Sequence, residues 1–184
     1  MTVINVIGKA SDKALGEIIL SQLSNSYRVT YIKSKSLVQE GNGYEIVVAD
    51  FTELKSLYAP ECFIVLKNGG AVPRIPLPEK TIIVVNSENI DQLNALRGVG
   101  CTVITCGASV KDTLSCSSYG FADDDNSVMV SLNREVTAFS GRKIQPLEIP
   151  LKLPKLPKDV YYAIAFTAIR LILDDFNSEL GALI

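Results

Sequence analysis

The segment from Thr81 to Gly107 constrains the fold most, because it holds a strand, a short helix and a second strand within about thirty residues. Thr81 to Val85 is an unbroken β-branched run, which is typical of a parallel strand buried on both faces. Asn89 to Arg97 has the pattern of a helix that its first residue can cap, with Gln92 three residues further on. Thr102 to Thr105 is the second strand. The segment therefore predicts a βαβ unit and an α/β core.

The residues before this unit repeat the alternation of strand and helix. Four apolar runs are predicted as strands and one amphipathic stretch as a helix: strands Val3–Ile7, Tyr27–Lys33, Tyr44–Ala49 and Cys62–Leu66, and helix Asp12–Leu23. The polar stretch 34–43 is predicted as a connection, because it contains two glycines and an asparagine in a row at 41–43. We expect residues 1–112 to form a mostly parallel, Rossmann-like or P-loop-like sheet flanked by helices.

The pattern changes after residue 112. Short strands are predicted at 113–121, 127–132, 136–139 and 144–149, with polar turns such as 123–126 between them, and this spacing is typical of an antiparallel β meander. Residues 146–157 are proline-rich and are expected to be a stiff, extended connection. A final apolar helix is predicted at 159–176. The whole chain, 1–184, is expected to be a single α/β domain with its core at 1–112, its meander at 113–153 and its closing helix at 159–176.

The closing helix is apolar nearly all round, so it is either buried on every side or has one face on a partner chain. We expect one face to lie on the sheet and part of the other to form a homodimer contact. The sequence does not identify any other protein partner.

The absence of histidine limits the chemistry more than any other feature of the composition. Histidine is the commonest general base at neutral pH and the commonest transition-metal ligand, so we predict no catalytic residue and no metal site. The four cysteines, at 62, 101, 106 and 116, match no zinc spacing and are assigned to core packing. A net charge of −2 provides no basic patch, so no nucleic-acid partner is expected.

No membrane partner is expected either. The longest apolar run, Val160 to Leu173, is interrupted by Arg170 and is too short to span a bilayer. The first strand begins without a basic segment and an apolar signal core before it. We therefore expect a cytoplasmic protein in a reducing environment.

The turn after the first strand is where an α/β protein would hold a phosphate. This turn, Gly8 to Ala14, contains Lys9 and Lys13, but it lacks the second glycine and the Lys-Ser or Lys-Thr pair of a P-loop. Asp12 stands near the helix start, where its carboxylate suits the helix dipole but would repel a nucleotide phosphate. A plain capped turn is favoured over a nucleotide site.

Polar residues also follow the later strands, and ligands of parallel sheets bind beyond the carboxyl ends of the strands. Asp50 follows the third strand and is a candidate for holding a metal or a substrate amine, against the alternative of a solvated loop residue. Lys67 to Gly70 follow the fourth strand and are predicted to lie at the same end of the sheet.

Several short segments resemble the central, ATP-binding domain of the Mur ligase family, whose members join amino acids to peptidoglycan precursors with ATP. They are Ile4–Gly8, Val47–Asp50, Leu66–Asn68, Val85–Glu88 and Val160–Ala165. The resemblance implies that Gly8 matches the first P-loop glycine, Asp50 the catalytic carboxylate, and Asn68 and Asn86 two asparagines of the family's motifs. It covers essentially the whole chain, and we expect no counterpart of the family's separate N-terminal and C-terminal domains.

The chain departs from the family where the chemistry lies. Ser11, Asp12 and Lys13 stand at the P-loop positions of Gly, Lys and Thr, the Asp-His pair after the fourth strand is missing, and Lys158-Asp159 stands where His-Asn would begin the closing helix. These changes remove groups on which the positioning and charge stabilisation of phosphoryl transfer depend. The first hypothesis is therefore a non-catalytic Mur-ligase-like protein without a cofactor, which acts as a binding or scaffolding module. Its small polar ligand would lie at the strand ends, near Gly8, Lys9, Lys13, Asp50, Asn68, Asn86, Ser109 and Lys111.

Two alternatives stay open. In the first, the chain is an ATP-dependent amide-bond ligase or ATPase with ATP and magnesium as cofactors, in which Lys9 or Lys13 replaces the usual lysine and Asp50 holds the magnesium. In the second, Cys106 or Cys116 is a nucleophile, which without histidine would need Lys111 beside it to lower the thiol pKa.

Overall fold

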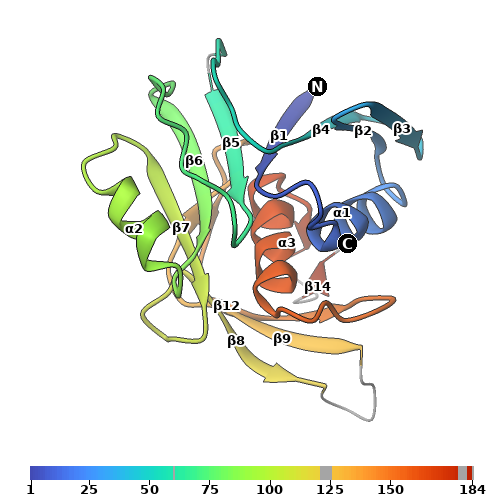
Figure 1. Ribbon diagram of the computed structural model, residues 1–184. Helices are drawn as coiled ribbons and strands as arrows, with labels where there is room; N and C mark the ends of the chain where they lie inside the picture. Colours follow the sequence, from blue (N-terminus) through green and yellow to red (C-terminus); the bar gives the residue numbers. More distant parts are fainter. Residues whose placement is uncertain (60, 121–125, 178–181, 184) are drawn as a thin grey trace. The chain divides into compact units, whose positions relative to one another are not determined.

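The computed structural model in Figure 1 describes residues 1–59, 61–120, 126–177 and 182–183. The chain divides into two compact units, Met1–Val103 and Ile104–Ile184, and the division falls inside strand β7. The assignment of the whole chain to a single domain stays a prediction.

Unit 1, blue to green in Figure 1, holds six complete strands in the order β6-β5-β1-β4-β2-β3 and two helices. The pairings β2–β4, β4–β1, β1–β5 and β5–β6 are parallel, and only β2–β3 is antiparallel within this order. The elements are β1 Thr2–Ile7, α1 Ala14–Leu23, β2 Arg28–Lys33, β3 Ser36–Glu40, β4 Glu45–Phe51, β5 Glu61–Leu66, β6 Lys80–Asn86 and α2 Ile90–Leu96. The predicted, mostly parallel α/β core is confirmed.

The core of unit 1 lies on its central parallel strands. Every residue of β5 after Glu61 is buried, as are the last four residues of β1. One apolar cluster joins Ile7, Ile64 and Ile83 from three neighbouring strands with Leu96 of α2. Helix α2 begins as predicted, because Oδ1 of Asn89 accepts a hydrogen bond from the backbone N–H of Gln92 at 3.2 Å.

The stretch 34–43, predicted as a connection, contains the edge strand β3. Lys33 lies opposite Ser36, so Ser34 and Lys35 form a two-residue hairpin turn between β2 and β3. Ser34 has a φ of 46°, which is the positive φ that such turns favour. All five residues of β3 are exposed, and for this reason it lacks the apolar pattern that predicts a strand.

Unit 2, yellow to red in Figure 1, is built on antiparallel strands. Its elements are β7 Thr102–Gly107, β8 Leu114–Tyr119, β9 Ser127–Leu132, β10 Val136–Thr137, β11 Lys143–Ile144, β12 Leu147–Lys152, α3 Tyr161–Ile172, β13 Phe176–Asn177 and β14 Ala182–Leu183. Strand β9 pairs antiparallel with both β8 and β12, which confirms an antiparallel arrangement in this part of the chain, whereas β8 pairs parallel with β7. The strands β10 and β11 pair with each other in a separate two-stranded sheet. Residues 121–125, which include most of the predicted turn at 123–126, lie outside the described residues.

The proline-rich stretch 146–157 is only partly the expected stiff connection, because residues 147–152 are strand β12. Pro150 lies opposite Met129 of β9. Proline cannot donate to a strand ladder, and β12 accommodates it because this strand ends the sheet order.

All twelve residues of α3 are buried. Within unit 2 the helix packs against β8, β9 and β10, and Arg170, its one charged residue, pairs with Asp175 at 2.5 Å. Burial on every side is one of the two alternatives that the apolar sequence leaves open, and the homodimer contact through 159–176 stays a prediction. No helix in the described part of the chain is long and apolar enough to cross a membrane.

Candidate functional site

The parallel strands of unit 1 bring the polar residues that follow them to one edge of the sheet. The register sets Val6 beside Asp50 and Ile7 beside Leu66. Beyond the strand end, the backbone N–H of Gly8 donates to the carbonyl of Phe51 at 2.9 Å. The turn after β1 therefore lies between the end of β4 and the end of β5.

Lys67, the first residue after β5, is the centre of this edge. Its side chain is fully buried, and its Nζ donates to both carboxylate oxygens of Asp50, at 2.8 and 2.9 Å, and to the backbone carbonyl of Asp12 at 2.7 Å. These three acceptors match the three N–H groups of an ammonium. Lys67 and Asp50 form a buried ion pair whose lysine has no donor left for a ligand.

Asp50 has further partners from β2. The hydroxyl of Tyr31 donates to its Oδ2, and Nζ of Lys33 lies 3.9 Å from the same oxygen. Burial is the larger cause and the hydrogen bond to Asp50 the second cause that raise the pKa of Tyr31 well above its usual value. This phenol therefore keeps its proton. The carboxylate that the sequence offers as a metal ligand is thus occupied by a lysine and a tyrosine of its own chain.

Gly8 allows the Lys67 side chain to enter the turn. A Cβ on Gly8 would lie 2.5 Å from Cβ of Lys67 and 3.0 Å from its Cδ. Only a glycine leaves room for this approach. The space beside Gly8, which a P-loop would offer to a phosphate, is taken by the aliphatic chain of Lys67.

A second polar group lies at the ends of β5 and β6. Nδ2 of Asn86 donates to Oδ1 of Asn68 at 2.8 Å, and Nδ2 of Asn89 donates to the backbone carbonyl of Asn68 at 2.7 Å. Oδ1 of Asn86 accepts from the backbone N–H of Glu88 at 2.9 Å. The two predicted asparagines therefore meet, although they meet as partners of each other.

The remaining predicted residues are Lys9 and Lys13 in unit 1 and Ser109 and Lys111 in unit 2. Lys9 and Lys13 are exposed, and a Cβ on Gly69 would lie 3.1 Å from Cε of Lys9. Ser109 and Lys111 belong to unit 2, where the backbone N–H of Lys111 donates to Oγ of Ser109 in a local turn. The structure thus brings Gly8 and Asp50 together around Lys67, and Asn68 and Asn86 together beside them.

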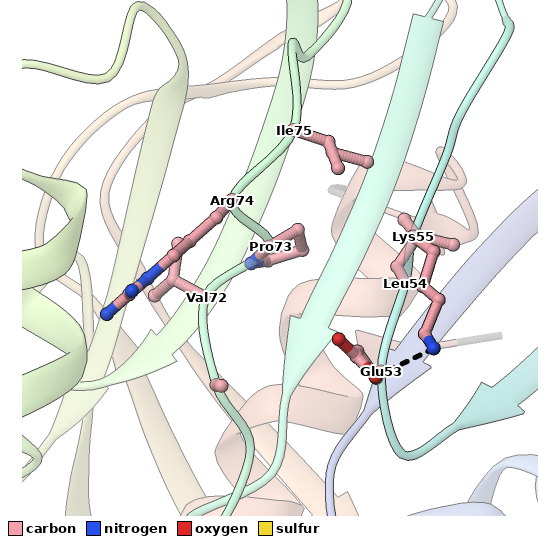
Figure 2. A pocket seen from close by; sticks show the side chains of 8 residues that line it. Glu53, Leu54, Lys55, Val72, Pro73, Arg74 and Ile75 are labelled. Atoms are coloured by element: carbon pink, nitrogen blue, oxygen red, sulfur yellow. Dashed lines mark ion pairs between the residues drawn. The ribbon is translucent and has the colours of Figure 1, made fainter.

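Two depressions flank the segment Ala71–Arg74, which follows this edge. The first, of about 400 Å³, is lined by Glu53, Leu54, Lys55, Ala71, Val72, Pro73, Arg74 and Ile75. Figure 2 shows the Glu53–Lys55 ion pair on one side of the segment and Arg74 directed away from it. The second, of about 370 Å³, lies toward α2 and is lined by residues 68–72, Arg74, Asn89, Asp91, Gln92 and Ala95.

Sequence reasoning missed four residues of this region: Tyr31, Lys67, Arg74 and Gln92. The sequence does contain an indication that Lys67 is buried, because a lysine that directly follows an apolar strand has little access to water. The other three have none in the sequence alone, since their partners come from other elements. No group of three or more cysteine, aspartate or glutamate side chains is placed to hold a metal within the described residues.

The cysteines lie in packing positions. All four are free thiols, and burial raises the pKa of both Cys106 and Cys116. A nucleophilic thiol needs a lowered pKa, so this finding counts against the cysteine-nucleophile alternative.

The buried thiol of Cys62 predicts a loss of stability in alkali. Burial raises its pKa from 9.0 to about 11, so between these values the unfolded chain releases the proton and the folded chain keeps it. The stabilisation is complete below pH 9 and decreases as the pH rises toward 11, by about 1.4 kcal/mol per pH unit at most. Urea unfolding of wild type and Cys62→Val between pH 7 and 10.5 should show a steeper decline for wild type. Equal slopes for the two proteins would contradict the prediction.

No protein-family model and no curated protein sequence matches the chain. Solved structures match it at low identity. A murein peptide ligase from Psychrobacter arcticus has 12% identity over 93% of this chain, with a TM-score of 0.52. The UDP-N-acetylmuramate:L-alanyl-gamma-D-glutamyl-meso-diaminopimelate ligase from Neisseria meningitides has 12% identity over 93%, with a TM-score of 0.53. A UDP-N-acetylmuramoyl-L-alanyl-D-glutamate–2,6-diaminopimelate ligase has 10% identity over 96%, with a TM-score of 0.52.

The chain spans 44%, 61% and 44% of the lengths of these three ligase chains, which is less than two thirds of each. At 10 to 12% identity the likeness concerns the fold and not the activity. It agrees with the resemblance found in the sequence, and the fold of this chain is a Mur-ligase-like α/β fold.

Proposed function

We propose that this chain is a non-catalytic Mur-ligase-like protein that acts as a binding module for a small polar ligand. The observation that carries the proposal is the pairing of Lys67 with Asp50. An ammonium of the protein itself neutralises the carboxylate that would otherwise hold a metal, and its stem fills the turn that would otherwise hold a phosphate.

ATP and magnesium do not fit the residues present. Magnesium takes oxygen ligands in near-octahedral geometry at about 2.0–2.1 Å, so it needs a carboxylate with open lone pairs. Both oxygens of Asp50 already accept from Lys67, and one of them also accepts from Tyr31. A metal at Asp50 would have to displace a fully buried lysine that is held by three hydrogen bonds, and breaking a buried ion pair is strongly destabilising.

The phosphate side of the turn supports the same proposal. Phosphates bind where several backbone N–H groups point at one space with a cation nearby. Here the backbone N–H of Gly8 donates to Phe51, and that of Asp12 donates to the carbonyl of Lys9 at 3.0 Å. The similar structures are ligases by name, but this chain covers only part of each, and their reaction is not carried over to it.

The alternative, an ATP-dependent amide-bond ligase or ATPase, depends on Lys9 and Lys13. Both are exposed, so each has an ammonium that a phosphate could reach from solvent. Neither forms an ion pair with another described residue, and an exposed lysine alone contributes little positioning.

A thermal-shift titration with ATP, ADP and UDP-linked sugars, each with and without magnesium, tests the proposal. A ligand that binds only the folded state stabilises it by RT ln(1+[L]/Kd) and so raises the melting temperature. Because the proposed binding module does not bind these nucleotides, we expect no rise with any of them. Lys9→Gln and Lys13→Gln are suitable companions, since both side chains are exposed. A rise of several degrees with ATP and magnesium that either substitution removes would establish the ligase or ATPase instead.

The compartment and the assembly remain parts of the proposal. Four free thiols are compatible with a reducing, cytoplasmic location. The homodimer is proposed through residues 159–176, and sedimentation at several protein concentrations would reveal it.

A further inference from the structure

The depression between the Asn68–Arg74 segment and helix α2 combines a size, a fixed polar group and two opposite charges. Its volume of about 370 Å³ is in the range of small-molecule sites. It lies wholly within unit 1 and next to the Asn68–Asn86 pair. Lys67, which pairs with Asp50, directly precedes Asn68, the first residue of this segment.

Gln92 forms part of the lining, and its side-chain amide has a fixed orientation. Nε2 donates to the backbone carbonyls of Lys67 at 2.8 Å and Gly70 at 2.7 Å, which uses both of its N–H groups. Its Oε1 must then face away from these carbonyls. This oxygen is buried and has no hydrogen-bond partner among the described residues. A buried acceptor without a donor costs about 1–3 kcal/mol, so the site is one N–H or O–H short.

Arg74 and Asp91 add charge to the same lining. Both side chains are exposed, and neither forms an ion pair with another described residue. Figure 2 shows that Arg74 is directed away from Glu53 and Lys55, which pair with each other on the far side of the segment. Arg74 lines both depressions, and its side chain is directed away from the charged pair of the one at Glu53.

We propose that this depression binds a small organic carboxylate that also carries an N–H or O–H donor. The carboxylate lies on the guanidinium of Arg74, in the forked geometry that arginine offers to two oxygens. The donor hydrogen-bonds directly to Oε1 of Gln92. Asp91 favours donors that are positively charged over neutral ones. The inference rests on the proposed binding role, because it names the ligand chemistry of that role.

The other depression offers no such match. Glu53 and Lys55 in its lining already pair with each other, and five of its six remaining lining residues are apolar. No buried acceptor lacks a donor there among the described residues. The carboxylate site is therefore assigned to the α2 side of the segment.

The test is an NMR titration of the full chain with glycolate, N-acetylglycine and glycine, and with acetate as the probe that lacks a donor. We expect saturable, millimolar binding of at least one donor-bearing probe, at least tenfold tighter than that of acetate, with amide shifts confined to 68–74 and 89–95. Arg74→Gln should weaken this binding at least tenfold, and Lys55→Gln, on the other side of the segment, should leave it unchanged. Asp91→Asn should weaken glycine more than glycolate. All three substitutions concern exposed side chains, so we expect each variant to keep the fold.

Failure of all three donor-bearing probes to bind, or binding that Arg74→Gln leaves unchanged, would overturn the inference. Binding of acetate as tight as that of the other probes would also overturn it, since the unpaired Gln92 oxygen would then play no part. The outcome is separable from the proposed function. A rise in the melting temperature with a nucleotide overturns the proposed function. If no nucleotide raises the melting temperature and no carboxylate probe binds, only this inference is overturned.

Discussion

Replacement of Lys67 by methionine is expected to lower the free energy of unfolding by about 3–5 kcal/mol, the usual cost of removing one partner of a buried ion pair. Methionine keeps most of the aliphatic stem that packs on Gly8. It removes the ammonium, so Asp50 stays buried, 3% exposed, with its main counter-charge gone. The carbonyl of Asp12 also loses its donor. Urea unfolding at pH 7 measures the change.

Lys33→Met is the matched control. Its ammonium lies 3.9 Å from the same carboxylate, but its side chain is 17% exposed, against 0% for Lys67. We expect a cost below about 1 kcal/mol for this weaker, more solvated pair. The double variant Lys67→Met with Asp50→Asn should recover part of the loss, because no buried charge is then left unpaired. A cost for Lys67→Met no greater than that for Lys33→Met would contradict the central role given to the buried pair.

The elements that sequence analysis predicted best are those with a strong local pattern. Cys62–Leu66 is a continuous apolar run, Thr81–Val85 is β-branched throughout, and Val3–Ile7 is interrupted only by Asn5. Each is a central strand in the structure. Strand β3 has no such pattern, since every side chain on it is exposed. Its pairing with β2 depends on the hairpin turn at Ser34, which has a positive φ. The pattern of apolar residues does not predict this backbone conformation.

The sequence predicted at which edge of the sheet the polar residues would lie, but not which groups they would contact. The rule that polar residues gather at the carboxyl ends of parallel strands placed Asp50 and Asn68 at one edge, and they do lie there. The rule gives no information on partners. The lysine that neutralises Asp50 follows β5, which is separated from β4 by β1 in the sheet order. Such a contact depends on strand order and side-chain length, neither of which is encoded in the local sequence around Asp50.

Gly16→Ala is expected to destabilise the protein by about 2–4 kcal/mol, against the usual gain of about 1 kcal/mol for this change in a helix. Gly16 belongs to the first turn of α1 and is buried. A Cβ there would meet the hydroxyl of Tyr31 and would lie 2.7 Å from its Cζ. The ring must then move away from α1, and its hydroxyl loses the hydrogen bond to Asp50. Urea unfolding of the variant beside wild type measures the loss.

A double-mutant cycle with Tyr31→Phe separates this contact from helix propensity. Phenylalanine removes the hydroxyl that the new methyl group meets first, so Gly16→Ala should cost at least 1 kcal/mol less in the Tyr31→Phe background than in wild type, an interaction energy of the size found for residues in contact. An equal cost in both backgrounds would place the strain elsewhere in α1. A stabilised Gly16→Ala would mean that Tyr31 does not pack against Gly16. The cycle therefore tests whether helix α1, strand β2 and the Asp50–Lys67 pair form one packed unit around the turn, as the geometry requires.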